Sequence, residues 1–316
     1  MNNTKRLKTK NNRITRRRKN TTPFPIDVVY TWKGENKSNN IRHGYNNEMK
    51  YSLRSIEDYA PWVNKIYILM NNKKQPSWIK ENNKIIIVEH ADTFPSSKYL
   101  PNTNSNAIET TISNIPELSE HYIYFNDDFF LGKKINYTEF FTPDGKALVD
   151  KYAMETNKIL KDPNYNVLGI EYPETGHRMY KHVPITQIKS DVIEFNEKYS
   201  DYIHWIRMTK KRNLRGFDLC KSTGLNTPCQ QIHYSIAKYM YSKGHAILKD
   251  NDDPSKVKYI ENGAKTLSED LKDVINNKYL FFCINDTQRN ANKRIDVQKK
   301  MLEFFNTYYP NKASFE

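Results

Sequence analysis

Short apolar runs alternate with helical patterns of apolar positions along the first half of the chain. Three runs of β-branched and aromatic residues predict buried strands, at 26–32, 65–69 and 84–88. Apolar residues at helical spacing predict a helix over 47–59, which Pro61 ends. A second helix is expected to start at Asn104 or Ser105, either of which can cap it, and to run to about Asn114.

The next apolar run, residues 121–125, predicts a strand that delivers Asn126, Asp127 and Asp128 at its carboxyl end. Alternating strands and helices with short connections predict an α/β fold with an open, mostly parallel sheet of the Rossmann-like or GT-A-like kind. Ligands of such sheets bind at the carboxyl ends of the strands. The acidic pair therefore falls where a ligand is expected.

The second half of the chain is more helical and is expected to complete the site. Apolar spacing predicts four further helices, at 187–206, 230–243, 267–276 and 293–306. Thr266 and Glu269 have the spacing of a capping box at the start of the third. The aromatic run 279–284 predicts another strand, which ends in Asn285 and Asp286.

Composition places the chain among globular proteins. Its 316 residues are enough for a large buried core, and 22 Tyr, 14 Phe and 4 Trp supply the apolar bodies that disordered chains lack. The net charge is +14, but nine of the basic side chains lie in residues 1–19, and the first acid is Asp27. We expect a disordered basic tail over 1–22. The alternative is an arm that binds nucleic acid, an anionic membrane surface or a transport receptor.

No apolar stretch follows the tail, and no window approaches the roughly 20 apolar residues of a membrane span. The expectation is a chain without signal peptide or transmembrane segment, in the cytoplasm. Three cysteines, Cys220, Cys229 and Cys283, match neither a disulfide framework nor a CxxC metal site, which favours a reducing compartment. A bridge between Cys220 and Cys229 stays open as an alternative.

Carboxylates at strand ends can hold Mg²⁺ or Mn²⁺, which prefer oxygen ligands and bridge the phosphates of a nucleotide. Asp128 and Asp286 could meet at one cation, although turn chemistry alone explains each Asn-Asp pair. A rival cluster contains Asp250 and Asp252, in the Asp-x-Asp spacing of many manganese-dependent glycosyltransferases. Pro254 beside it favours an exposed, solvated loop.

Four segments in order closely resemble the Stealth family: IDVVYTW (26–32), NNEMKYSLRSIEDYAPWVNKIYIL (46–69), LPNTNSNAIE (100–109) and HYIYFNDDFFLG (121–132). The family's third region resembles His182-Val-Pro184 with the stretch around Arg215, for which Arg207 is a competing alignment. Its fourth resembles Phe282-Cys-Ile-Asn-Asp286. The family includes bacterial capsule sugar-phosphate transferases and the α/β subunit of the lysosomal-enzyme N-acetylglucosamine-1-phosphotransferase.

The resemblance implies transfer of a hexose-1-phosphate, such as GlcNAc-1-phosphate from UDP-GlcNAc, to an acceptor hydroxyl on a glycan, with Mg²⁺ or Mn²⁺ and release of the nucleoside monophosphate. It implies three catalytic residues, Asp128, His182 and Arg215. It implies four metal ligands, Asp127, Asp128, Asn285 and Asp286. It also implies residues that line or support the donor site, namely Tyr30, Trp32, Glu48, Arg54, Asn104, Ser105 and Glu109. An ion pair with Asp58 is the alternative for Arg54.

The expected domain organisation is a tail over 1–22, a catalytic domain over 23–287 and a C-terminal helix over 288–316 that packs on it. A homodimer is compatible with the sequence. Two other functions stay open. A glycosyltransferase using Asp250 and Asp252 would release a nucleoside diphosphate, and a non-catalytic binding module would act through the basic tail.

Overall fold

The structure, a computed structural model, describes residues 22–34, 47–71, 76–80, 82–150, 153–155, 178–180, 182–211, 232–249 and 255–316. The basic tail, Arg215 and the Asp250 to Asp252 cluster lie outside these residues, as do Cys220 and Cys229. No helix among the described ranges is long and apolar enough to cross a membrane.

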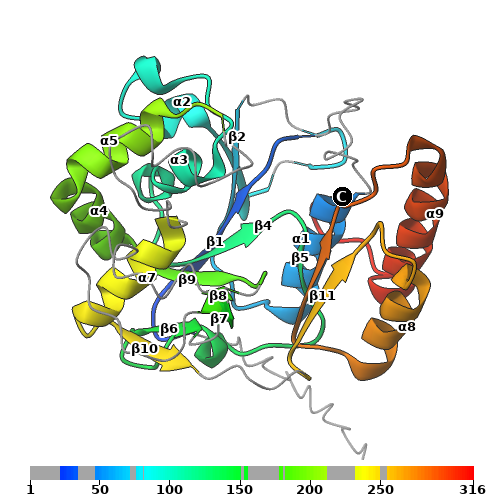
Figure 1. Ribbon diagram of the computed structural model, residues 1–316. Coiled ribbons are helices and arrows are strands. Elements are labelled where there is room, and N and C mark those ends of the chain that lie inside the picture. The colour runs from blue at the N-terminus through cyan, green and yellow to red at the C-terminus, as the bar shows by residue number, and fades with distance from the viewer. Residues whose placement is uncertain are drawn as a thin grey trace, which may run out of the picture.

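A five-stranded sheet in the order β3-β2-β1-β4-β9 forms the centre of the protein (Figure 1). Its strands are β1 (Ile26–Thr31), β2 (Ile66–Met70), β3 (Ile85–Glu89), β4 (His121–Asn126) and β9 (Ile185–Ile188). The first four are parallel, and β9 runs antiparallel to β4. The predicted α/β class with a mostly parallel sheet is confirmed.

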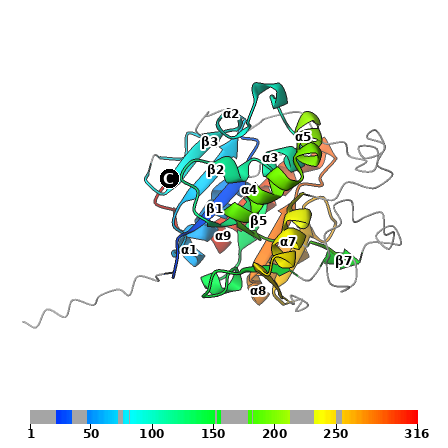
Figure 2. The same ribbon diagram turned by 90° about the vertical axis from the view of Figure 1, so that its left-hand side faces the viewer.

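Helices cover both faces of this sheet. One face carries α1 (Glu48–Tyr59), and the other carries the four helices α3 (Ser105–Glu109), α4 (Lys189–Lys198), α5 (Ser200–Met208) and α7 (Ile232–Ser242) (Figures 1 and 2). The short α2 (His90–Thr93) follows β3 directly. Because successive side chains of β1 point to opposite faces, Tyr30 reaches Ser52 of α1, whereas Thr31 reaches Tyr124 on the other face.

A second sheet, β11-β12-β5, lies beyond α1. It consists of β11 (Val257–Glu261), β12 (Phe281–Asn285) and β5 (Phe129–Leu131), with β12 parallel to β11 and antiparallel to β5. Two helices, α8 (Leu267–Asn277) and α9 (Ala291–Tyr308), flank this sheet (Figure 1). Since β5 follows β4 after a two-residue turn, the two sheets meet at that turn.

An aromatic core joins α9 to the second sheet. Phe130 of β5 stacks on Phe282 of β12 with ring centroids 5.0 Å apart. Phe305 of α9 also packs against Phe130, with ring centroids 5.1 Å apart. The Tyr308 and Tyr309 hydroxyls each donate 2.6 Å hydrogen bonds to the carbonyls at the end of β5. The C-terminal helix is thus packed on the rest of the protein.

Smaller elements complete the chain. Two strand pairs are β6 (Ala147–Asp150) with β10 (Ala246–Lys249), and β7 (Ala153–Glu155) with β8 (Arg178–Tyr180). Three 3₁₀ turns are η1 (Ser97–Tyr99), η2 (Ile112–Asn114) and η3 (Tyr137–Glu139).

Three predicted helix boundaries needed correction or refinement. Residues 185–188 form β9 because they pair with the free edge of β4. The rest of the helix expected over 187–206 is divided into α4 and α5. The helix after Asn104 ends at Glu109. Its cap is confirmed, since Asn104 Oδ1 accepts a 3.2 Å bond from the Asn106 amide. The capping box is wrong: Thr266 has helical backbone angles, and its hydroxyl bonds Asp270 instead.

Candidate functional site

The turn between β4 and β5 carries Asp127 and Asp128 at the carboxyl end of the central sheet. The amide of Ile284 in β12 donates a 3.1 Å hydrogen bond to the carbonyl of Asp128. This bond continues the antiparallel pairing of β5 with β12. The backbone therefore brings the end of β12, with Asn285 and Asp286, beside the acidic turn.

Asp128, His182 and Cys283 lie together at this junction. One potential ligand atom from each, a carboxylate oxygen, an imidazole nitrogen and the thiol sulfur, lies within 4.8 Å of the other two. The Cys283 thiol donates a 3.3 Å hydrogen bond to Asp128 Oδ2. Cys283 is fully buried, whereas Asp128 and His182 are partly exposed to solvent. Three separate segments thus contribute to one cluster that solvent can reach from one side.

Burial disfavours negative charge in this cluster. Desolvation raises the pKa of Asp127 above that of an ordinary aspartate. Desolvation and the neighbouring charge of Asp127 raise the pKa of Asp128. Burial, together with the charge of Asp128, also holds the pKa of the Cys283 thiol well above its usual range. At neutral pH the thiol is therefore protonated and acts as a donor to the carboxylate.

Tyr259 and Asn285 extend the cluster along the second sheet. The Tyr259 ring lies 5.1 Å from the His182 imidazole, centroid to centroid, and is 43% exposed. Asn285 Nδ2 donates a 2.7 Å hydrogen bond to the Tyr259 hydroxyl. The two side chains therefore present polar groups next to His182, on the side that faces solvent.

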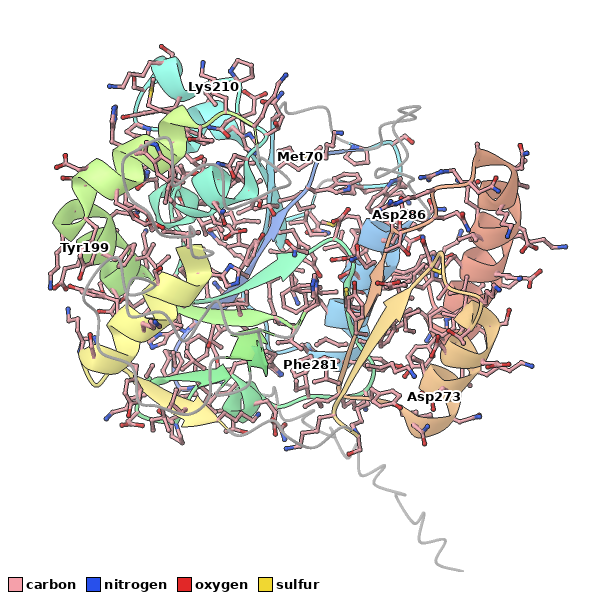
Figure 3. All side chains as sticks on the ribbon, in the orientation of Figure 1. Met70, Tyr199, Lys210, Asp273, Phe281 and Asp286 are labelled. Carbon is pink, nitrogen blue, oxygen red and sulfur yellow. The ribbon has the colours of Figure 1, made fainter. Side chains whose placement is uncertain are left out.

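Asp286 is held from the opposite direction. Asn262 Nδ2 donates a 3.0 Å bond to its Oδ1, and Arg294 Nη1 lies 3.5 Å from its Oδ2. Asn262 Oδ1 also accepts from the amides of Thr287 and Gln288, so it fixes the backbone just after the strand. Figure 3 shows Asp286 and Phe281 at opposite ends of β12. The backbone of Asp286 lies close to the acidic turn, but its carboxylate contacts Asn262 and Arg294, the latter in α9.

The chemistry of the donors partly fits the cation that the sequence suggests. Asp127 and Asp128 offer the oxygen ligands that Mg²⁺ and Mn²⁺ prefer. Within the described part of the chain, however, Asp127 and Asp286 do not belong to the group of side chains close enough for one ion. That group instead combines Asp128 with a nitrogen and a sulfur donor.

A second polar cluster is centred on Glu109, which is buried at the end of α3. Its Oε2 lies 3.1 Å from Nδ1 of His233 in α7, and its Oε1 lies 3.3 Å from the Tyr124 hydroxyl. That hydroxyl is also within 3.0 Å of Thr31 Oγ1 and 2.7 Å of Asn126 Oδ1. The cluster links the carboxyl ends of β1 and β4, so it adjoins the acidic turn.

Two other residues predicted for the donor site have mainly structural contacts. Tyr30 is fully buried, and its hydroxyl lies 2.7 Å from Ser52 Oγ. Arg54 pairs through Nε and Nη2 with Glu316 and donates through Nη1 to the Tyr309 carbonyl at 2.8 Å. The sequence suggested Asp58 as an alternative partner of Arg54, but the structure pairs Arg54 with Glu316. Both residues are buried, and their polar groups bond protein atoms.

The remaining predicted donor residues follow β1 or lie at the starts of α1 and α3. Trp32 is 4% exposed and packs 6.1 Å from Trp78, and Glu48 is buried at the start of α1. Asn104 caps α3 and donates a 3.0 Å bond to the Thr209 carbonyl, and Ser105 is the first residue of that helix.

The competing arginine also has a structural place. Arg207 Nε donates a 2.9 Å bond to Thr110 Oγ1, and its Nη2 donates a 3.0 Å bond to the Thr110 carbonyl. Arg207 therefore holds the end of α3 against α5. Arg215 lies outside the described residues.

Sequence reasoning did not single out several side chains of these clusters, among them Tyr124, His233, Tyr259 and Cys283. Tyr124 and Cys283 lie within predicted strands, two or three residues before polar strand ends, and alternation along each strand could have placed them on the same face as those ends. His233 is one of eight histidines, and no local signal separates it from the others.

Comparison with known proteins gives two family matches. The model of Stealth protein conserved region 2 matches residues 42–149, and that of conserved region 4 matches residues 272–316. The first match includes the acidic turn, α1 and α3, and the second includes β12 and α9. The resemblance noted in the sequence is confirmed.

Three curated relatives cover most of the chain. An exopolysaccharide phosphotransferase of Streptomyces coelicolor is 27% identical over 93% of this chain and 52% of its own length. A capsular polysaccharide phosphotransferase of Haemophilus influenzae is 29% identical over 91% and 85%, respectively. One of Streptococcus pneumoniae is 28% identical over 92% and 98%. The chain spans about half the length of the first of these relatives and nearly all of the last.

Proposed function

We propose that this chain, a Stealth protein by its second and fourth conserved regions, transfers a hexose-1-phosphate from a nucleotide-diphosphate sugar to a hydroxyl of a polysaccharide. The curated relatives that it resembles are named capsular or exopolysaccharide phosphotransferases, which supports the reaction class. The proposed donor is UDP-GlcNAc, the proposed transferred group is GlcNAc-1-phosphate, and the proposed leaving group is the nucleoside monophosphate.

The observation that carries this proposal is the placement of Asp128 beside His182 at the carboxyl edge of the central sheet. Phosphoryl transfer needs an aligned hydroxyl, a group that takes its proton and stabilisation of the phosphate charge. Both side chains are accessible, and either can take that proton. The parallel order β3-β2-β1-β4 supports the finer assignment to a Rossmann-like or GT-A-like fold, which places ligands at this edge.

In the proposed reaction the acceptor oxygen forms a bond to the sugar-bearing phosphorus of the donor. The bond from that phosphorus to the oxygen bridging the two phosphates breaks, and the electron pair leaves with the nucleoside monophosphate. The acceptor proton passes to His182 or Asp128. A Mg²⁺ or Mn²⁺ ion held through Asp127 and Asp128, with Asn285 and Asp286 as the other proposed ligands, would neutralise phosphate charge when bound.

The donor is proposed to lie over the ends of β1 and β4, where Glu109 and its neighbours form the second polar cluster. Trp32, Glu48, Asn104 and Ser105 are proposed to shape this side. Tyr30 and Arg54 are proposed to support it from beneath, since their polar groups bond protein atoms. Arg215 is proposed, from the resemblance alone, to stabilise charge on the transferred phosphate.

Incubation with a set of nucleotide sugars, a divalent cation and oligosaccharide acceptors tests the proposal. We expect the release of nucleoside monophosphate, which falls at least about a hundredfold in Asp128→Asn and His182→Ala. Asp296→Asn, an exposed carboxylate in α9, is the matched control. Near-normal turnover by both site variants would show that neither Asp128 nor His182 takes part in the transfer. Release of nucleoside diphosphate would instead identify a glycosyltransferase.

A further inference from the structure

We propose that Asp128, His182 and Cys283 form a binding site for Zn²⁺, and that Zn²⁺ held there inhibits the transfer reaction. The site combines three kinds of donor atom, and the inhibition rests on the function proposed above. The binding itself does not depend on that function, because it follows from the three side chains alone.

The geometry is close to that of a zinc site. Ligands of a tetrahedral Zn²⁺ lie about 2.0–2.3 Å from the ion, which separates them from each other by roughly 3.5 Å. The Cys283 sulfur and Asp128 Oδ2 are already 3.3 Å apart, and the imidazole nitrogen of His182 lies within 4.8 Å of both groups. A small movement of the partly exposed His182 side chain would bring its nitrogen to the same separation and complete three ligands.

The donor set selects Zn²⁺ over Mg²⁺. Mg²⁺ takes oxygen ligands and would leave the sulfur unused, whereas Zn²⁺ binds sulfur, nitrogen and carboxylate oxygen together. Cys283 lies within β12, whose pairing with both β5 and β11 fixes the position of its sulfur. On binding, the thiol loses its proton to solvent and the resulting thiolate holds the ion. A fourth position would remain for water, as in zinc sites with three protein ligands.

Occupation of this site would remove two groups that the transfer needs. A His182 nitrogen bound to Zn²⁺ has no lone pair left to accept the acceptor proton. An Asp128 oxygen bound to Zn²⁺ is no longer free to hold the Mg²⁺ or Mn²⁺ of the proposed reaction. Zn²⁺ should therefore inhibit in competition with the activating Mg²⁺ or Mn²⁺.

Cobalt binding to the full chain tests the site without any activity measurement. Co²⁺ occupies zinc sites and gives a thiolate-to-metal absorption band in the near ultraviolet when sulfur is a ligand. We expect one Co²⁺ per chain with this band, displaced by one equivalent of Zn²⁺. Cys283→Ser should lose the band, and both it and His182→Ala should bind Zn²⁺ about tenfold or more weakly. Cys229→Ser is the matched thiol control and should keep the band.

Two results would overturn the site: no sulfur-derived band in the wild-type chain, or equal Zn²⁺ affinity in the wild type, Cys283→Ser and His182→Ala. Circular dichroism verifies that each variant is folded, and His182→Ala tests the site should Cys283→Ser not fold. A chain that binds Zn²⁺ as expected but transfers no sugar phosphate would overturn the proposed function and leave the site. An active chain that binds Zn²⁺ here with unchanged turnover would overturn the inhibition.

Discussion

Nδ1 of His233 lies 3.1 Å from Oε2 of Glu109, and this contact joins α7 to α3 inside the protein. The two side chains are 10% and 7% exposed, so a lost partner would leave a polar group without water to replace it. Because Asn104 caps α3, the contact also holds the helix that begins with two residues of the proposed donor side.

We expect Glu109→Ala to lower the free energy of unfolding by about 1–3 kcal/mol, because it removes the buried contact between Glu109 and His233. Addition of His233→Ala should cost less than it does in the wild type, with a coupling energy of about 1–3 kcal/mol. Urea denaturation of the four proteins measures this cycle. Glu303→Ala, an exposed residue of α9, is the control. Strict additivity would contradict a direct contact.

Arg54 and Lys50 hold Glu316 against α1, and this contact makes stability depend on pH in the acid range. Burial opposes ionisation of Glu316, but the hydrogen bonds from Arg54 and Lys50 outweigh it and lower its pKa to about 2. The folded protein thus binds this proton less readily than the unfolded chain does. The stabilisation is complete above about pH 4.5 and is lost as the pH falls toward 2.

Glu316→Gln should therefore lower the free energy of unfolding by about 2–3 kcal/mol at pH 7. The difference from the wild type should shrink as the pH falls from 4.5 to 2. Denaturation at several pH values measures it, and Glu303→Gln serves as the exposed control. A difference that is the same at pH 7 and pH 2.5 would show that the lost contact is not ionic.

His90, at the start of α2, predicts a second pH dependence. Its Nδ1 is buried and has no hydrogen-bond partner among the described residues, and burial lowers its pKa to about 4. Between pH 6.5 and 4 the unfolded chain therefore binds a proton that the folded protein does not. Stability should fall across this window as the pH falls, by up to about 3 kcal/mol.

His90→Gln has no titrating group at this position and should show a shallower loss of stability between pH 6.5 and 4. Thermal unfolding in a pH series compares it with the wild type. The window lies above that of Glu316, so the two effects can be separated in one titration. Parallel curves for the two proteins would assign the acid sensitivity to other groups.

The aromatic core under α9 predicts a large effect of one truncation. Phe305 is fully buried and packs on Phe130 and on Tyr51, with ring centroids 5.1 and 4.7 Å away. Phe305→Ala should destabilise the protein by about 3–5 kcal/mol, because it removes buried apolar surface and leaves a cavity. Leu302→Ala, on the exposed side of the same helix, should change stability by about 0.5 kcal/mol or less. Similar losses in both would contradict the packing of α9.

Local pattern was sufficient for much of the architecture. Strands such as β1, β4 and β12 were predicted within one or two residues, because the spacing of apolar side chains is a property of neighbouring positions. Other strands, such as β5, β9 and β11, do not follow from local pattern, and β9 shows the reason. Residues 185–188 form β9 because the edge of β4 offers hydrogen-bond partners, and the sequence of that segment does not indicate this pairing.

The pattern of residues along the chain is enough to establish the α/β class, the family resemblance and the position of Asp127 and Asp128 at a strand end. Tertiary structure decided which side chains surround them. Cys283 reaches Asp128 only because β12 pairs with β5, and Arg54 meets Glu316 only because the chain returns to α1 after α9. Apolar periodicity acts over a few residues, whereas hydrogen bonds, charge and burial act between groups that folding brings together from distant segments.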